Sequence, residues 1–334
     1  LWVLDQIATM LNVPRARVVA SSHHRSHAAS AFFCSPFDKA AVLTIDGVGE
    51  DMTTGIWRGQ DRRIQCLDSI EYPHSLGLFY AALTAYLGFE VNEGEYKVMG
   101  LAAYGRSRFK DEFASLINLH ADGSFSLNLR YFGFHTDAEI GFNNKLEQLL
   151  GPRRVPNRPW DLDQSEDDRR FADIAATLQW STEEAILGLA RRAKDRTDCN
   201  NLCLAGGVAL NCVANARLLR DSGFPRVFVQ PAAGDAGAAL GAAALGVIEL
   251  DGIRPAPLVT CALGDIIEND EVLGLARQLG IPCRKPDDVF AVAADLVATG
   301  KLVAFARGRF EWGPRALGQR SILGTASELA TRER

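Results

Sequence analysis

The sequence predicts a mixed α/β fold in which helices cover a sheet. Short runs of aliphatic and β-branched residues alternate with longer segments whose apolar residues recur at helical spacing. The composition agrees with this class, because 47% of the 334 residues are hydrophobic and 23% are charged. Such values are typical of a globular protein with a full core. The length corresponds to about two domains.

The first part of the chain supplies a helix, a hairpin and a second helix. Ser21 or Ser22 is a candidate N-cap for a helix through "HHRSHAASAFF". The segment "KAAVLTID" (39–46) predicts a buried strand that ends in a glycine turn, "GVGE". Its hairpin partner is "TTGIWRG" (53–59), and "LGLFYAALTAYLGF" (76–89) has the periodicity of a helix.

Helices and strands continue to alternate through the middle of the chain. Residues 151–170 form a polar loop that contains three prolines and separates the two halves of this pattern. Behind it we expect a long helix, a strand, a helix, a strand and an Ala-rich helix, at 171–196, 201–207, 209–223, 226–231 and 236–250.

A change in composition at 250–265 predicts an interdomain linker. A helix (289–300) and a strand (301–306) follow it. Only about seventy residues remain beyond the linker, and a domain of that size would be marginally stable by itself. We therefore expect residues 1–255 to form a first domain and 256–334 to form the start of a second. The chain also opens without a Met, which suggests a fragment.

Charge and cysteine content restrict the class of protein. The net charge of −5 argues against a surface built for nucleic acid. Seven cysteines, an odd number without paired CxxC motifs, suggest reduced core residues in a cytoplasmic protein. Neither a signal peptide nor a membrane span is visible.

Three of the six histidines stand in "SSHHRSHAASAFF". His23 and His27 are four positions apart, so in a helix their imidazoles share one face, which His24 does not. That spacing suits a first-row metal, although no Glu follows the first His as it does in HExxH peptidases. Taken alone, such a pair is more often two surface histidines that share a helix face.

Two aspartates strengthen the metal hypothesis. Asp46 ends the strand 39–46, and Asp235 lies in "PAAGDAG" between a strand and the Ala-rich helix. Carboxylates at the C-terminal ends of strands face the crevice in which α/β proteins bind ligands. With the two histidines they would make a mixed N/O site for Fe(II), Zn(II) or Mn(II). Each Asp by itself is more commonly a helix cap or a turn former.

Glycine turns and an arginine cluster suggest anion binding. The turns are "DGVGE", "LAGGVALN" and "AAGDAG", and none is a P-loop or a dinucleotide fingerprint. The segment "RGRFEWGPRALGQRS" has four arginines, of which Arg320 stands beside Ser321, and its aromatic residues suggest the wall of a phosphate or carboxylate pocket more than a solvated loop. Glu95 and Lys97 precede a Gly/Ala stretch, in what is equally well a solvated turn.

Taken in order, these segments resemble the O-carbamoyltransferases of the nodulation and antibiotic-tailoring type. The resemblance runs through "HHRSHAASAF", "LTIDGVGE", "GEYKVMGLAAYG", "LCLAGGVALNCVANARLL", "VFVQPAAGDAGAALGAA" and "GRFEWGPRALGQRSIL". It implies an actin/hexokinase-type (ASKHA) ATPase core, like that of the tRNA threonylcarbamoyl transferases, over 1–255. At 256–334 it implies the start of a carbamoyl-phosphate-activating, YrdC-like α/β domain. Against the family pattern, we expect the chain to lack both ends.

The resemblance also implies the roles of individual residues. A metal, reported as iron in the family, would be bound by His23, His27, Asp46 and Asp235. The nucleotide and its phosphates would meet Gly47, Gly49, Glu95, Lys97, Gly206, Gly207 and Asn211. Carbamoyl phosphate would meet Arg307 and Ser321, with Arg315 and Arg320 as catalytic residues. Asp137, in "FHTDAEIGF", is the candidate base for the acceptor hydroxyl, although a surface turn explains it equally well.

The implied reaction moves a carbamoyl group from carbamoyl phosphate, through an ATP-derived carbamoyl-adenylate, to a hydroxyl of a sugar or natural product. ATP with Mg²⁺ and a divalent metal (Fe²⁺, with Zn²⁺ or Mn²⁺ as alternatives) would be required. We expect neither nucleic acid nor membrane as a partner. The rival interpretations are a tRNA threonylcarbamoyl-transferase-like protein, a sugar kinase and a non-catalytic nucleotide-binding remnant.

Overall fold

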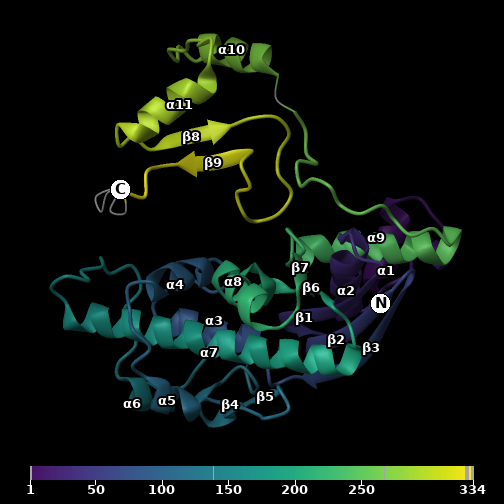
Figure 1. Cartoon of the computed structure of the whole chain (residues 1–334), viewed down its shortest axis with the longest axis vertical. Coiled ribbons are helices and arrows are strands. Elements are labelled where there is room, and N and C mark those ends of the chain that lie inside the picture. The colour runs from purple at the N-terminus through teal and green to yellow at the C-terminus, as the bar shows by residue number, and fades with distance from the viewer. Residues whose placement is uncertain (1, 138, 267, 328–330, 332–334) are drawn as a thin grey trace. The chain divides into compact units, whose positions relative to one another are not determined.

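The computed structural model describes residues 2–137, 139–266, 268–327 and 331. The chain divides into two compact units, Leu1–Pro257 and Leu258–Arg334, which are considered separately (Figure 1). The division falls within the segment 250–265. The functional identity of the two units stays a prediction.

Unit 1 is built on a mixed five-stranded sheet. Its strands are β1 (Lys39–Gly49), β2 (Met52–Gln60), β3 (Arg63–Glu71), β6 (Asn201–Ala205) and β7 (Arg226–Val229). They lie in the order β3-β2-β1-β6-β7. The pairs β1–β2 and β2–β3 are antiparallel, and the pairs β1–β6 and β6–β7 are parallel. The predicted α/β class is confirmed, and β1 is the central strand.

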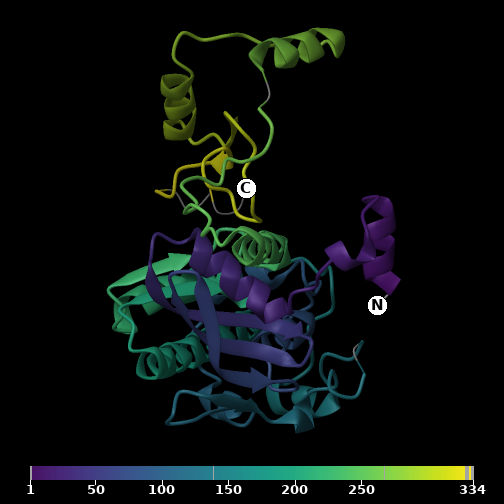
Figure 2. The same cartoon turned by 90° about the vertical axis from the view of Figure 1, so that its right-hand side faces the viewer.

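Helices cover both faces of the sheet. Alternate side chains of β1 point to opposite sides. Ala40 and Val42 pack under α2 (His23–Cys34) and α9 (Asp235–Asp251), which lie side by side (Figure 2). Ala41 and Leu43 join the larger core under α3 (Leu76–Tyr86) and α7 (Glu166–Thr197). Because β1 is buried on both sides, it reads as an apolar run in the sequence.

Other elements of unit 1 are shorter and mostly escaped prediction. They include α1 (Trp2–Met10), α4 (Glu95–Ala102), α5 (Lys110–Ala114), α6 (Asn144–Leu150), α8 (Cys212–Asp221), β4 (Ile117–Leu119) and β5 (Phe125–Leu127). Of these, α8 was predicted, because it lies within the expected helix 209–223. The edge strand β3 was missed because its polar, half-exposed residues lack a clear alternation. The long helix α7 begins five residues before its predicted start, where Ser165 Oγ accepts a hydrogen bond from the Asp168 backbone N–H.

The elements assigned within the described residues of unit 2 are two helices and a two-stranded antiparallel sheet. These are α10 (Asn269–Gln278), α11 (Val289–Ala298), β8 (Val303–Ala306) and β9 (Arg320–Leu323). The helix α11 and the strand β8 were predicted. The helix α10 and the strand β9 were not predicted, the latter because it follows a polar, arginine-rich loop.

Three local expectations were wrong or met only in part. The predicted glycine turn after Asp46 is instead strand, because β1 continues to Gly49 and the hairpin turns at Glu50–Asp51. Ser22 is the N-cap residue of α2, but its side chain makes no capping hydrogen bond. The cysteines are free, yet only three are buried, and Cys66, Cys212 and Cys283 are exposed.

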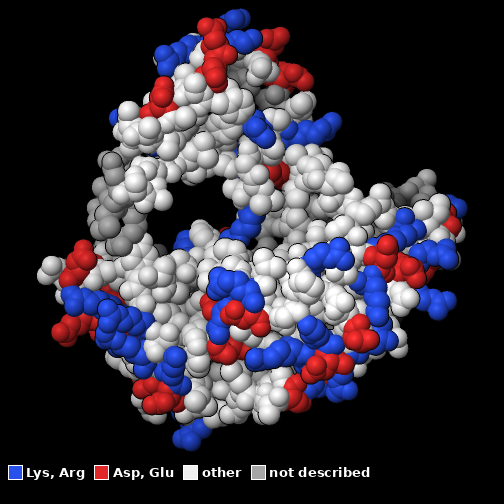
Figure 3. Space-filling view, viewed as in Figure 1, with Lys and Arg blue, Asp and Glu red and all other residues white. Residues whose placement is uncertain are grey.

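In the view of Figure 3, basic and acidic side chains are interspersed over unit 1. Among the described residues, every helix is too short or too polar to cross a bilayer.

A glycine brings α2 and α9 into backbone contact. A Cβ added at Gly241 of α9 would lie 1.9 Å from the Ser26 carbonyl oxygen of α2 and 2.7 Å from the Ser30 nitrogen. Gln230 reinforces the junction, since its Nε2 donates to the Ser30 carbonyl at 2.8 Å. No side chain larger than hydrogen fits at this crossing.

We therefore expect Gly241→Ala to separate α2 from α9 and to destabilise unit 1 by about 1–3 kcal/mol. The matched control is Gly246→Ala in the same helix, where an added Cβ meets nothing within 4 Å. That change should stabilise by about 0.5–1 kcal/mol, because alanine favours the helix. Urea unfolding followed by circular dichroism measures both; equal effects of the two substitutions would contradict the close crossing.

Candidate metal centre

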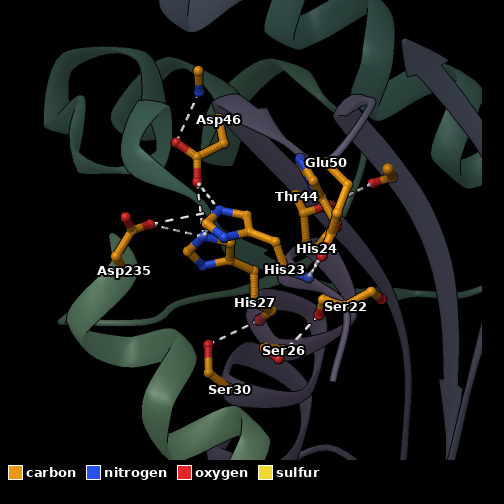
Figure 4. Close-up of polar contacts among 12 residues, drawn as sticks. Ser22, His23, His24, Ser26, His27, Ser30, Thr44, Asp46, Glu50 and Asp235 are labelled. Atoms are coloured by element: carbon orange, nitrogen blue, oxygen red, sulfur yellow. Dashed lines mark hydrogen bonds and ion pairs between the residues drawn. The ribbon is translucent and has the colours of Figure 1, made fainter. Parts of the chain in front are cut away.

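Four side chains from three elements converge at one end of the sheet (Figure 4). His27 Nε2 lies 2.7 Å from Asp46 Oδ2 and 3.4 Å from Asp235 Oδ1. His23 Nε2 lies 3.2 Å from Asp46 Oδ2, 3.5 Å from Asp235 Oδ1 and 3.0 Å from His27 Nε2. One donor atom of each residue lies within 4.8 Å of the others. The structure thus brings together the four residues that the sequence analysis grouped as metal ligands.

Local structure explains this convergence. His23 and His27 stand one turn apart at the start of α2, and Asp235 is the first residue of α9. The close α2–α9 crossing carries Asp235 toward the two histidines. Gly49, near the end of β1, leaves room for the His23 ring, because a Cβ there would lie 2.3 Å from the ring's Cδ2.

Two residues that the sequence analysis missed hold the cluster in place. Both carboxylate oxygens of Glu50 accept from the His23 backbone N–H at 3.2 Å, which replaces the missing side-chain cap of α2. The Ser75 hydroxyl donates to the Asp46 carbonyl at 3.1 Å and caps α3 by accepting from the Leu78 N–H. The serine just before an apolar helix is a recognisable cap signal. Nothing in the sequence paired Glu50 with α2.

His24, the third histidine of the run, points away from the cluster. Its Nδ1 lies 2.9 Å from Thr44 Oγ1 inside the core, and burial lowers the pKa of His24 to about 4. The expectation that it would not share the face of His23 and His27 is confirmed.

Electrostatics tie the histidines to Asp46. Burial alone would raise the pKa of the Asp46 carboxyl, but hydrogen bonds from His23 and His27 outweigh it and hold that pKa well below its usual range. The hydrogen bond to Asp46 raises the pKa of His23 above its ordinary value. Asp46 is therefore ionised at neutral pH, and its proximity favours the protonated form of His23.

The donor set fits a divalent cation. His27 is fully buried, and its Nδ1 has no hydrogen-bond partner among the described residues. Its Nε2 faces both carboxylates and is the atom that could bind a metal ion. The 3.0 Å between the Nε2 atoms of His23 and His27 leaves room for at most one proton between them. The carboxylates of Asp46 and Asp235 face the same two nitrogens. Ligands about 2.1 Å from one ion stand about 3.0–3.4 Å apart in octahedral or tetrahedral geometry, close to the separations found here. Two nitrogens and two oxygens suit first-row divalent metals.

The second glycine turn lies against the cluster. A Cβ at Gly207 would stand 3.1 Å from Asp46 Oδ1, and Gly206 adopts φ +93° with its backbone packed on Ile45. Asn211 follows as the N-cap of α8, where its Oδ1 accepts from the Ala214 N–H at 3.1 Å. Gly47 adjoins Asp46 and donates its N–H to that carboxylate at 2.8 Å. The structure thus places Gly47, Gly207 and the metal-ligand candidates together.

Three other predicted residues occupy more peripheral positions. Glu95 begins α4, where its carboxylate accepts from the Asn92 N–H at 3.0 Å, so the expected turn is a helix start. Lys97 is exposed on the same helix. Asp137 lies in an exposed turn, with its carboxylate accepting from the Glu139 N–H at 3.0 Å. Their predicted roles remain untested.

In unit 2, a cavity of about 650 Å³ lies between α11 and the β8–β9 sheet. Arg307 and Ser321 line it among mainly apolar neighbours such as Phe290 and Val297. The Arg320 guanidinium instead stacks on the Phe310 ring at 3.9 Å and donates to the Arg307 carbonyl at 2.8 Å. Arg320 and Arg315 are not among the residues that line this cavity.

Comparison with known proteins identifies the family. Residues 3–244 match the model described as carbamoyltransferase N-terminus, and residues 294–334 match the model described as carbamoyltransferase C-terminus. The chain belongs to the carbamoyltransferase family. The predicted recognition is confirmed, and an actin/hexokinase-type core agrees with the mixed sheet of unit 1.

Three relatives show the extent of the similarity. An uncharacterized protein of Synechocystis is 46% identical over 91% of this chain and 50% of its own length. Nodulation protein NolO of Bradyrhizobium diazoefficiens is 36% identical over 94% of the chain and 55% of its own length. Nodulation protein NolNO of Sinorhizobium fredii is 35% identical over 96% and 45%, respectively. This carbamoyltransferase-family chain therefore spans about half the length of the curated relatives it matches.

Among solved structures, the crystal structure of full-length HypF in its phosphate- and nucleotide-bound form resembles 74% of this chain and 45% of its own. The TM-score is 0.39 and the identity 15%, a likeness too distant to inform the site.

The two glycines of "DGVGE" provide a matched test of the cluster. Gly49→Ala should displace the His23 ring and weaken Co²⁺ binding by about tenfold or more, because one ligand leaves its position. Gly47→Ala should leave Co²⁺ affinity unchanged, since the nearest atom to its added Cβ is 3.9 Å away. Cobalt absorption titrations measure both, and equal affinities of the two variants would refute this packing of His23.

Metal affinity should fall as the pH falls. The raised pKa of His23 means that a proton competes with the ion at a higher pH than for an ordinary histidine. Below that pKa the apparent affinity should drop by up to about tenfold per pH unit. Co²⁺ titrations between pH 8 and pH 6 measure the slope, and calorimetry in two buffers measures the proton released. If the Co²⁺ affinity did not change between pH 8 and pH 6, the assignment would be contradicted.

Proposed function

We propose that this protein is an O-carbamoyltransferase that uses carbamoyl phosphate and ATP to carbamoylate a hydroxyl of a sugar or natural product. The observation that supports this best is the convergence of two histidines and two aspartates beside a glycine turn, in a chain of the carbamoyltransferase family. The match of residues 294–334 to the family's C-terminal model favours this reaction over a tRNA threonylcarbamoyl transferase.

The metal centre would be held by His23, His27, Asp46 and Asp235. Fe²⁺ is the first candidate, and Zn²⁺ and Mn²⁺ suit the same donors. When bound, a divalent ion supplies Lewis acidity next to the phosphate-side glycines. Asp46 is ionised and Ser75 fixes its backbone, so the site needs little rearrangement to receive a cation.

The nucleotide would lie over the glycine turns of unit 1. Gly47 and Gly207 are the partly exposed members of the set, whereas Gly49 and Gly206 are buried against His23 and Ile45 and would act through the shape of their turns. The helix α8 begins just beyond the second turn. Asn211, at the start of α8, would contact the nucleotide directly. Glu95 and Lys97, on α4, are further candidates, and Mg²⁺ would accompany ATP.

Carbamoyl phosphate would bind in unit 2, where Arg307 and Ser321 share a cavity. Hydrolysis of carbamoyl phosphate releases inorganic phosphate and leaves carbamate. An oxygen of the carbamate then attacks the α-phosphorus of ATP. This step forms carbamoyl-adenylate and releases pyrophosphate, with Arg315 and Arg320 stabilising the charge. The acceptor hydroxyl then loses its proton to a base, for which Asp137 is the candidate. Its oxygen attacks the carbamoyl carbon, and AMP departs.

Metal content and turnover test this proposal together. We expect about one iron per chain after anaerobic reconstitution and its loss in the His23→Ala/His27→Ala double variant. In the protein's full reading frame, AMP formation should require carbamoyl phosphate and be lost in the same variant. His120→Ala, an exposed histidine paired with Ser126, is the control that keeps both. Unchanged metal content in the double variant, or AMP formation without carbamoyl phosphate, would overturn the assignment.

A further inference from the structure

A pair of amides joins α7 to the start of α8. Asn211 Nδ2 donates to Gln179 Oε1 at 2.9 Å, and Gln179 Nε2 donates to Asn211 Oδ1 at 3.0 Å. Gln179 is 5% exposed, and Asn211 is half-buried. Because each amide both donates and accepts, reversing one amide alone would bring like atoms together.

Independent partners fix the orientation of each amide. The Ala214 backbone N–H only donates, so it requires the oxygen of Asn211, and the two atoms lie 3.1 Å apart. The Glu183 carboxylate only accepts, so it requires the nitrogen of Gln179, at 2.9 Å. The orientations required by Ala214 and Glu183 are the same ones that allow Asn211 and Gln179 to donate to each other.

The network reaches further on the side of Gln179. Arg217 of α8 donates to the second oxygen of Glu183 at 3.1 Å, which holds that carboxylate in place. The Tyr80 hydroxyl donates to Gln179 Oε1 at 3.3 Å. Gln179 therefore uses both N–H groups and both oxygen lone pairs, and it has no capacity left for a ligand.

Asn211 keeps one group that no described residue uses. Its Oδ1 accepts from both Ala214 and Gln179, while only one of its two N–H groups is donated within the described part of the chain, to Gln179. The helix cap needs only the oxygen of Asn211, so Gln179 is not required for capping. What Gln179 adds is a fixed direction for the remaining N–H.

We propose that Gln179 is a positioning residue that locks Asn211 so that it presents a single N–H donor, and never an acceptor, to the bound nucleotide. This inference rests on the proposed nucleotide role of Asn211. It specifies that the atom of the nucleotide facing Asn211 is a hydrogen-bond acceptor, such as a phosphate or ribose oxygen or a ring nitrogen. A nucleotide with a hydrogen-bond donor opposite this N–H of Asn211 would bind more weakly.

A double-mutant cycle with Mg·ATP as the probe tests the inference. Asn211→Ala should weaken ATP binding by about tenfold or more, because a hydrogen bond to the nucleotide is lost. Gln179→Met, which keeps the length of the side chain but removes its polar atoms, should also weaken binding by about tenfold. In the Asn211→Ala background the same Gln179→Met change should have almost no further effect. Gln148→Met, at an exposed position of α6, is the matched control.

The outcomes separate the two proposals. If Asn211→Ala leaves ATP affinity unchanged, the nucleotide role of Asn211 fails. If Asn211→Ala weakens binding while Gln179→Met either has no effect or adds its full effect in both backgrounds, Gln179 has no positioning role. Calorimetric titration gives the affinities, and a purely structural role would lower thermal stability without coupling to Asn211.

A measurement on the unsubstituted protein guards against misfolded variants. With ¹⁵N-labelled asparagine, Asn211 should give two separate side-chain N–H signals. ATP should shift the signal of the unpaired N–H strongly, whereas the N–H bonded to Gln179 should move little. Equal shifts of both signals, or a loss of their separation, would contradict a locked amide.

Discussion

The backbone contact between α2 and α9 is the constraint on which the candidate metal centre depends. Gly241 allows the second helix to lie directly against the Ser26 carbonyl, and only at that distance does the first residue of α9 reach the histidines on α2. The sheet fixes the third contributor, because Asp46 projects from the central strand on which α2 is packed. Two helices and one strand thus determine the four donor atoms, and none of these atoms comes from a long loop.

Polar contacts extend this rigidity away from the donor atoms. Glu50 holds the first turn of α2, and Ser75 joins α3 to the carbonyl of Asp46. Farther along, the chain Arg217–Glu183–Gln179–Asn211 connects α7 and α8 at the edge of the same region. Charged and amide groups at these places are satisfied by the protein itself, so their positions are fixed before a ligand arrives.

The sequence was sufficient for the pattern of elements and for the donor set, and insufficient for what supports them. Buried β1 and amphipathic α7 carry strong local signals, and HxxxH spacing places two imidazoles on one face whatever surrounds them. Carboxylates that follow strands could be grouped with them because parallel strands end at the same edge. By contrast, the partnership of Glu50 with His23 depends on how the hairpin bends over α2, and that of Gln179 with Asn211 depends on how α7 crosses α8. Such pairings arise from tertiary packing and leave no periodicity in the sequence. The polar edge strand β3 escaped for a related reason, since its place is set by β2.

The junction of α2 with α9 also has a consequence for the order in which the molecule can assemble. The bond from Gln230 to Ser30 joins residues 200 positions apart, and the ion pair of Arg25 with Glu249 joins residues 224 positions apart. During synthesis the residues of α2 are made early, and almost all of unit 1 must be made before those of its partner helix α9 are present. Contacts of such long range require the closure of a long loop, and folds rich in them fold slowly. The histidine–aspartate cluster can therefore form only after the early and late segments of unit 1 have packed against each other.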